Sequence, residues 1–201
     1  MKFWQSFLKR SGAAALAAAF AISLAACTNS GSPASSASSA VSQTSTAAAG
    51  PVTVKNAAGT DVTIQEAPKK IVVLPVWAAE MTLDLVDTGR VAGLSSYMDS
   101  SVTTALADTA KKVEKRVASE AEAILGLTPD LVVLDTFNDA DGSLAKTLTD
   151  AGVTVLTLAS PVTYEEIADR LTTLSKALFA ADKGDKLVSD MQAKLDAGLP
   201  Y

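Results

Sequence analysis

The stretch LTPDLVVLDTFND, residues 127–139, contains the features that decide the fold. Pro129 and Asp130 are expected to end a preceding helix, and residues 131–134 follow as an uninterrupted apolar run. Such a run, with β-branched residues in its middle, is typical of a strand that is covered on both faces, as in parallel sheets. The polar residues that follow lie at the carboxyl end of the strand, where ligands of open parallel sheets bind. The loop after Leu134 is therefore the first place to look for a functional site.

Strand and helix patterns alternate on both sides of this stretch. We predict, in chain order, a strand at 71–74, a loop at 75–78, a helix at 79–87, a strand at 91–94, a short helix at 101–110, an extended segment at 113–117, helices at 119–126 and 142–150, a strand at 153–158 and a helix after Thr163. A short β-hairpin over 52–64 precedes them. The alternation predicts an α/β fold: a Rossmann-like parallel sheet with covering helices and right-handed crossovers.

Two capping-box patterns predict where helices begin, and one glycine predicts an interruption. Ser119-x-x-Glu122 and Thr163-x-x-Glu166 each place a hydroxyl and a glutamate where they can satisfy backbone N–H groups at a helix start. After Thr163, apolar residues recur at helical spacing as far as Leu195, with an interruption expected at Gly184. We therefore predict a long helix over 161–201.

The composition excludes several classes of function. The 201 residues include no histidine and one cysteine, so neither a Ser-His-Asp triad nor a histidine-ligated metal centre can form within the chain. Three basic residues lie in a segment that we expect to be removed, which leaves 14 basic against 22 acidic residues, a formal net charge of −8. Nucleic acid is not an expected partner, because phosphate binding needs clustered lysine and arginine. A nucleotide-dependent enzyme is disfavoured because no glycine-rich loop follows the strand at 71–74. We expect no enzymatic activity, no cofactor and no metal site.

The first 50 residues have the pattern of an exported lipoprotein. Three positive charges, an apolar run over 12–24 and small residues are the parts of an export signal, which we place at 1–26. Its end, Leu24-Ala25-Ala26-Cys27, resembles the lipobox of bacterial lipoproteins, which implies attachment of lipid, palmitate included, at Cys27. The alternative is an ordinary signal peptide with an incidental cysteine. The rest of 27–50 is rich in Ser, Ala, Thr and Gly and carries no charge, which predicts a flexible tether.

Five segments together resemble one protein family. In chain order they are KNAAGTDVTI, KKIVVLPVWAAEM, GLSSYMD, EAILGLTPDLVVLDTFND and AGVTVLTL. Their order is similar to that of the Fe3+-siderophore/cobalamin/haem family of ABC-transporter solute-binding proteins, the helical-backbone class of periplasmic binding proteins. The resemblance implies two α/β lobes joined by a long rigid helix, with the ligand bound between the lobes. The chain matches the N-terminal lobe over 51–160 and the linking helix over 161–201. We expect it to be a truncated form of a two-lobed protein, and a genuinely single-lobed protein is the alternative.

The resemblance also implies which residues bind the ligand. The cleft floor of this lobe is formed by loops at the carboxyl ends of the strands, where the matching residues are Trp77, Ser96, Tyr97, Met98, Lys115, Arg116, Thr136, Phe137 and Asn138. Aromatic side chains stack on conjugated rings, and an arginine fork pairs with carboxylate or catecholate oxygens. Core packing is the alternative role for Trp77 and Phe137, and simple solvation is the alternative for Arg116.

The expected ligand is an iron chelate. Arg116 stands where the family often has an aromatic residue, which favours a ferric siderophore, or haem with its propionates, over cobalamin. Haem would need an axial ligand, and without histidine only Tyr97 or Met98 could serve. The leading interpretation is a lipid-anchored protein on the outer side of the cell membrane that delivers an iron-siderophore type chelate to an ABC permease and its ATPase.

Permease docking is implied for a surface carboxylate. Glu122 occupies the position of the family carboxylate that engages the permease, and Glu80 is the second candidate. For Glu122 the alternative is its place in the capping box. A different class of function is a single-lobed surface adaptor that binds no transport ligand.

Overall fold

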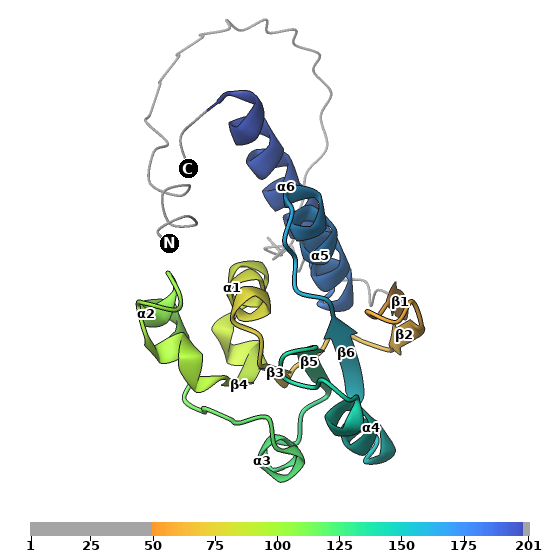
Figure 1. Ribbon diagram of the computed structural model, residues 1–201. Coiled ribbons are helices and arrows are strands. Elements are labelled where there is room, and N and C mark those ends of the chain that lie inside the picture. Colours follow the sequence, from red (N-terminus) through yellow and green to blue (C-terminus); the bar gives the residue numbers. More distant parts are fainter. Residues whose placement is uncertain (1–49, 199–201) are drawn as a thin grey trace, which may run out of the picture.

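The structure is a computed structural model that describes residues 50–198. The expected signal peptide and Cys27 lie outside the described residues. The described part has a four-stranded parallel sheet, helices on both of its faces, a two-stranded hairpin and two long C-terminal helices (Figure 1). Within this range no helix has the length and apolar character needed to cross a membrane.

The uninterrupted apolar runs form the centre of the parallel sheet. β5 (Leu131–Asp135) is buried along its whole length and lies between β3 (Ile71–Val73) and β6 (Thr154–Leu158). β4 (Val91–Leu94) pairs with the other side of β3, which gives the order β4-β3-β5-β6. The predicted parallel sheet is confirmed. Because the strand order reverses between β3 and β5, their carboxyl ends form a topological switch point, the usual ligand position in such sheets.

Alternate residues of β3 and β5 face two different hydrophobic clusters. The odd-numbered residues pack in the larger cluster with α1 (Val76–Leu85) and α5 (Tyr164–Ala177). The even-numbered residues pack in the smaller cluster with α3 (Ala121–Leu125) and α4 (Ser143–Asp150). Both faces of these strands are therefore covered, which explains why their sequences lack an alternation of polar and apolar residues.

The predicted hairpin is confirmed and packs beside β6. β1 (Val52–Lys55) and β2 (Asp61–Ile64) pair antiparallel. Val54 and Ile64 are buried in the larger cluster. In the turn, the backbone N–H of Ala57 donates to the carbonyl oxygen of Thr157 at 2.7 Å, which ties the hairpin to β6.

The helix after β3 begins earlier than the sequence predicts. α1 starts at Val76, directly after Pro75 at φ −66°, so the expected loop at 75–78 is wrong and Trp77 lies in the first helical turn. Proline suits this boundary because its fixed φ is helix-compatible and its missing N–H needs no partner there. Ala78 and Ala79 are fully buried, and their small side chains let the first turn approach the sheet.

The segment between β4 and α3 is less regular than predicted. β4 is followed by the 3-10 helix η3 (Ser96–Asp99), and of the helix predicted at 101–110 only α2 (Ala107–Ala110) is α-helical. Thr103 Oγ1 donates to the carbonyl oxygens of Tyr97 and Ser100, and such side-chain bonds compete with helix formation. The extended segment predicted at 113–117 forms a parallel bridge to β4.

One of the two predicted capping boxes forms. Thr163 and Glu166 satisfy each other's backbone N–H groups at the start of α5. The box predicted at Ser119 is wrong, because the N-cap of α3 is Glu120 and no side chain caps it. The later start puts Glu122 at the second helical position instead of the third, where the reciprocal hydrogen bond would have been made.

The long C-terminal helix is divided into two helices that pack side by side (Figure 1). α5 is followed by a turn in which Phe179 has φ +58°, and α6 (Ala181–Asp196) begins after it. The interruption predicted at Gly184 is wrong, since this glycine is buried inside α6. A Cβ atom there would overlap the Ser175 side chain, so the glycine allows α6 to approach α5 closely.

Candidate ligand-binding site

Exposed apolar side chains gather where the parallel strands end. We define the carboxyl edge as the first turn of α1, residues 95–106 after β4, residues 136–138 after β5 and residues 159–163 after β6. The large hydrophobic side chains that are exposed within residues 50–198 are Tyr97, Val102, Phe137 and Val162. All four lie on the carboxyl edge. Ligands of open parallel sheets bind outside the carboxyl ends of the strands, so these residues are candidates for ligand contacts.

Asp135 connects three segments of the carboxyl edge. It is the last residue of β5, and it is only 4% exposed. Its Oδ2 accepts hydrogen bonds from Trp77 Nε1 at 3.2 Å and from Ser160 Oγ at 3.0 Å. Its Oδ1 accepts from the backbone N–H groups of Phe137 at 3.1 Å and Asn138 at 3.0 Å. Asp135 was not among the residues predicted for the site, although an aspartate at the end of a buried strand is a signal that the sequence shows.

The loop after β5 presents the predicted residues to the outside. Thr136 is exposed, and Phe137 is 80% exposed, so the core-packing alternative for Phe137 is wrong. Asn138 is partly buried, and its Oδ1 is a buried atom for which no hydrogen-bond partner exists in the described part of the chain. Asn138 is thus the one residue of this loop whose side-chain oxygen is buried without a hydrogen-bond partner in the described residues.

Trp77 contacts both the core and the carboxyl edge. The side chain is half-buried and packs against the larger hydrophobic cluster. Its indole N–H is held by Asp135. The core-packing alternative for Trp77 is thus confirmed in part, and its contact with a ligand stays a prediction that its partial exposure at the switch point allows.

The residues of η3 point in different directions. Ser96 is exposed and Tyr97 is 55% exposed, as expected of ligand contacts. Met98 is fully buried in the larger cluster. A 3-10 helix turns about 120° per residue, which brings the third side chain to the inner face. Met98 is therefore unavailable to a ligand or to a haem iron, and its predicted role is wrong.

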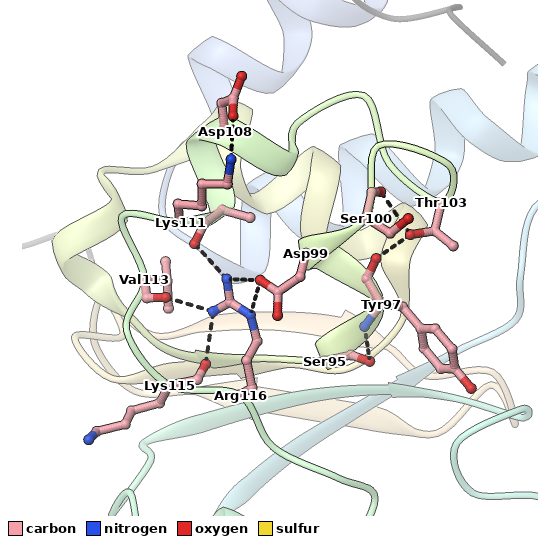
Figure 2. Close-up of polar contacts among 11 residues, drawn as sticks. Ser95, Tyr97, Asp99, Ser100, Thr103, Asp108, Lys111, Val113, Lys115 and Arg116 are labelled. Carbon is pink, nitrogen blue, oxygen red and sulfur yellow. Dashed lines mark hydrogen bonds and ion pairs between the residues drawn. The ribbon is translucent and has the colours of Figure 1, made fainter.

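Arg116 is engaged within the chain. Its Nε donates to Asp99 Oδ1 at 2.8 Å, and Nη2 lies 2.6 Å from the same oxygen. Nη1 donates to the carbonyl oxygens of Val113 at 2.6 Å and Lys115 at 3.2 Å, and Nη2 donates to that of Ala110 at 3.1 Å. Every N–H group of the guanidinium has a partner (Figure 2). The solvated-charge alternative is therefore wrong, and the guanidinium fork is occupied within the chain, where Arg116 ties its own segment to η3.

Tyr97 and Arg116 do not converge on a common ligand position. Figure 2 shows the Tyr97 ring pointing away from the guanidinium. The backbone of Tyr97 is fixed from both sides, since its N–H donates to Ser95 Oγ at 3.3 Å and its carbonyl oxygen accepts from Thr103 Oγ1. The exposed side chain of Lys115 extends away from Tyr97 in the same view. Of this group, only Ser96 and Tyr97 remain at the carboxyl edge with accessible side chains.

The two predicted docking carboxylates have different surroundings. Glu80 Oε1 accepts hydrogen bonds from Thr104 Oγ1 at 2.6 Å and from the backbone N–H of Ala105 at 3.0 Å, so Glu80 ties α1 to the carboxyl edge. Glu122 is exposed on α3, which leads into the amino end of β5 and lies away from the carboxyl edge (Figure 1). Residues 50–198 contain no group of three or more acidic or cysteine side chains arranged to hold a metal ion.

Comparison with known proteins relates the chain to binding proteins. Residues 71–197 match the periplasmic binding protein family. The uncharacterized ABC transporter substrate-binding lipoprotein YvrC of Bacillus subtilis (strain 168) is 33% identical over 152 residues, which make up 72% of this chain and 45% of that protein. A cobalamin-binding protein of Halobacterium salinarum (strain ATCC 29341 / DSM 671 / R1) is 27% identical over 126 residues, or 63% of this chain and 33% of that protein.

Solved structures share the fold. The heme-binding protein HmuT superposes with a TM-score of 0.59 at 23% identity, over 75% of this chain and 48% of that one.

The chain spans less than half the length of the two curated relatives named above. The family match covers most of the described residues, from β3 through α6, and the family is one of binding proteins and not of enzymes. The chain belongs to the periplasmic binding protein family.

Proposed function

We propose that the chain is the N-terminal lobe of a lipid-anchored, extracytoplasmic solute-binding protein of an ABC importer, and that its carboxyl edge forms one wall of the ligand site. The observation that carries the proposal is the position of Tyr97, Val102, Phe137 and Val162, the large apolar side chains exposed within residues 50–198, which all follow carboxyl ends of parallel strands. The name of the Bacillus subtilis relative, a substrate-binding lipoprotein, supports both the transport role and the anchor.

The proposed ligand is a large metal chelate of low net charge, with an iron siderophore of the hydroxamate type in first place. Tyr97 and Phe137 offer apolar contact surface, while Ser96, Thr136 and Asn138 offer neutral polar groups around it. Arg116 is paired with Asp99 and donates all of its N–H groups within the chain. A strongly anionic catecholate siderophore would therefore find no free arginine fork here.

Cobalamin is the second candidate. Arg116 in place of an aromatic residue favours an anionic ligand over cobalamin only as a free cation, and its hydrogen bonds within the chain weaken that preference. The relative named as a cobalamin-binding protein supports this alternative. Haem has less support, because Met98 is buried and only Tyr97 remains exposed among the two expected axial ligands.

Calorimetric titration of the full-length gene product tests the proposal. The probes are uncharged ferrichrome, cyanocobalamin, haemin and the strongly anionic ferric enterobactin. We expect saturable binding of ferrichrome that Phe137→Ala weakens by about tenfold or more, since an aromatic side chain buried by a ligand contributes on the order of 1.5–3 kcal/mol. Lys183→Ala, on the exposed surface of α6, is the control and should leave the affinity unchanged. Preference for cyanocobalamin would select the second candidate, and preference for enterobactin would refute the low-charge ligand. Binding of none of the probes would contradict the proposal.

The lipid anchor is tested separately. Cys27 lies outside the described residues, and the Leu24-Ala25-Ala26-Cys27 pattern supports its lipidation. In fractionated cells of the native host, the protein should be found with the membrane, whereas Cys27→Ala should be released or left unprocessed. Thr28→Ala is the matched control and should stay on the membrane. A Cys27→Ala protein that is processed and retained would refute the anchor.

A further inference from the structure

We infer that Asp135 is a positioning residue of the ligand site: its buried carboxylate holds Trp77, the loop after β5 and the segment after β6 in one fixed arrangement. Its effect on ligand affinity rests on the proposed function, whereas its effect on the arrangement of the carboxyl edge does not. The proposal rests on the four hydrogen bonds of this carboxylate and on its place at the switch point.

The burial of Asp135 makes it dependent on its hydrogen-bond donors. A carboxylate that is removed from water is strongly unfavourable unless its oxygens are paired or hydrogen-bonded. Asp135 is 4% exposed, and none of the ion pairs in the described part of the chain involves it. Its charge is therefore stabilised by four N–H and O–H donors, and each donor is in turn held in place by a charge-assisted hydrogen bond.

Each donor belongs to a segment that carries a candidate ligand contact. The indole N–H of Trp77 comes from α1, so its bond to Asp135 crosses the switch point between β3 and β5. The backbone N–H groups of Phe137 and Asn138 come from the loop after β5, and the Ser160 hydroxyl comes from the segment after β6. The ring of Phe137 stays 80% exposed, so Asp135 fixes its backbone without covering the side chain.

Asp139 provides an internal comparison. It is also buried, at 7% exposure, and it lies four residues further along the chain. Its oxygens accept from the backbone N–H groups of Leu144 at 3.0 Å and Ala145 at 2.9 Å, in the first turn of α4. Asp139 therefore has a structural role, because it satisfies backbone N–H groups that are free at the start of a helix. Its carboxylate accepts no hydrogen bond from a side chain of the carboxyl edge.

Asp135→Asn separates positioning from packing because it keeps the size of the side chain. An amide has one acceptor oxygen and one NH2 group that only donates. Whichever way the amide is oriented, two of the four original donors face an NH2 group. The Ser160 hydroxyl can rotate and accept, but the indole N–H of Trp77 and the backbone N–H groups cannot.

The structural arm of the test needs no ligand. It compares Asp135→Asn with Asp139→Asn in the full chain carrying Trp4→Phe, in which Trp77 is the only tryptophan. We expect Asp135→Asn to shift the indole 15N–1H resonance of Trp77 and to speed hydrogen exchange at Trp77, Phe137 or Asn138 by roughly tenfold or more. Asp139→Asn should speed exchange only at the start of α4. Equal effects of the two variants on Trp77, or no effect of Asp135→Asn, would overturn the inference. If Asp135→Asn does not fold, Ser160→Ala should still shift the indole resonance of Trp77. An unchanged resonance in Ser160→Ala would then overturn the inference.

The ligand arm uses the full-length gene product and ferrichrome. Asp135→Asn should weaken the affinity by about tenfold, the loss expected when one contact between the ligand and the displaced loop is broken. Asp139→Asn should leave the affinity unchanged. If neither ferrichrome nor any of the other three probes binds the unmodified protein, the proposed function fails while the indole resonance still decides the role of Asp135. If ferrichrome binds Asp135→Asn and the unmodified protein equally although the resonance has shifted, the proposed function stands and the inference fails.

Discussion

Replacing Arg116 by alanine should destabilise the lobe much more than the same replacement of Arg170. The two side chains are equally accessible, at 20% and 21% exposure, and each pairs with an aspartate. Arg116 also donates to three backbone carbonyl groups, whereas Arg170 donates to one, that of Ala159 at 2.9 Å. The difference between Arg116→Ala and Arg170→Ala therefore measures the two additional hydrogen bonds that Arg116 donates to backbone carbonyl groups.

These two hydrogen bonds set the expected difference in the free energy of unfolding between the two variants. A hydrogen bond to a charged group contributes roughly 1.5–3 kcal/mol when buried, and partial exposure reduces this to about 1–1.5 kcal/mol for each bond. The ion pairs largely cancel, because both carboxylate partners are exposed and such pairs contribute about 0–1 kcal/mol. Arg116→Ala should therefore lower the free energy of unfolding by about 2–3 kcal/mol more than Arg170→Ala.

Urea denaturation of the full chain at pH 7, followed by far-ultraviolet circular dichroism, measures this difference. Arg116→Lys should fall between the unmodified protein and Arg116→Ala, because lysine keeps the charge but cannot reproduce the planar fork. Equal destabilisation by the two alanine variants would refute the structural role of Arg116. A loss of ligand affinity at unchanged stability would instead restore the anion-binding role.

Three other features give sharp predictions. Gly184→Ala should lower the free energy of unfolding by about 1–3 kcal/mol because its Cβ would overlap Ser175. Adding Ser175→Gly to that variant should restore the stability. If urea denaturation shows that Gly184→Ala is more stable than the unmodified protein, the α5–α6 contact is contradicted. Backbone hydrogen bonds hold the pKa of Glu166 below its ordinary value of 4.5, so its stabilising contribution is present above pH 4.5 and is lost as the pH falls through the folded-state pKa. The urea midpoints of the unmodified protein and Glu166→Gln should therefore differ at pH 7 and converge in acid, and a pH-independent difference would argue against the capping role. Glu122→Ala should reduce uptake of ferrichrome by cells without changing its affinity, and a matching loss of affinity would place Glu122 in the ligand site.

Much of the sheet could be predicted from the sequence. The apolar runs at 71–74 and 131–134 indicate burial on both faces, and their alternation with helical patterns favours strands of a parallel sheet between two helical layers. The position of the candidate site followed from the same topology, because the polar and aromatic residues after each strand must gather at one edge. Tyr97 and Phe137 are exposed there as predicted.

The roles of individual site residues could not be predicted in the same way. Arg116 and its carboxylate partner are 17 residues apart in the sequence, and Asp135 and Trp77 are 58 residues apart. Neither pair therefore produces a local sequence pattern. Met98 and Tyr97 are neighbours in the sequence, yet one is core and the other is surface, because η3 is a 3-10 helix instead of the loop that was expected.

The C-terminal helices show the same division between sequence and tertiary structure. The sequence by itself determined that this region is helical and amphipathic, because apolar residues recur at helical spacing through Leu195. Only the tertiary structure decided that the chain reverses at Phe179 and that Gly184 lies inside a helix. The periodicity of side chains is the same for one straight helix and for two packed ones. The choice between them depends on which surface covers the apolar stripe, and here each helix covers part of the other where Gly184 meets Ser175.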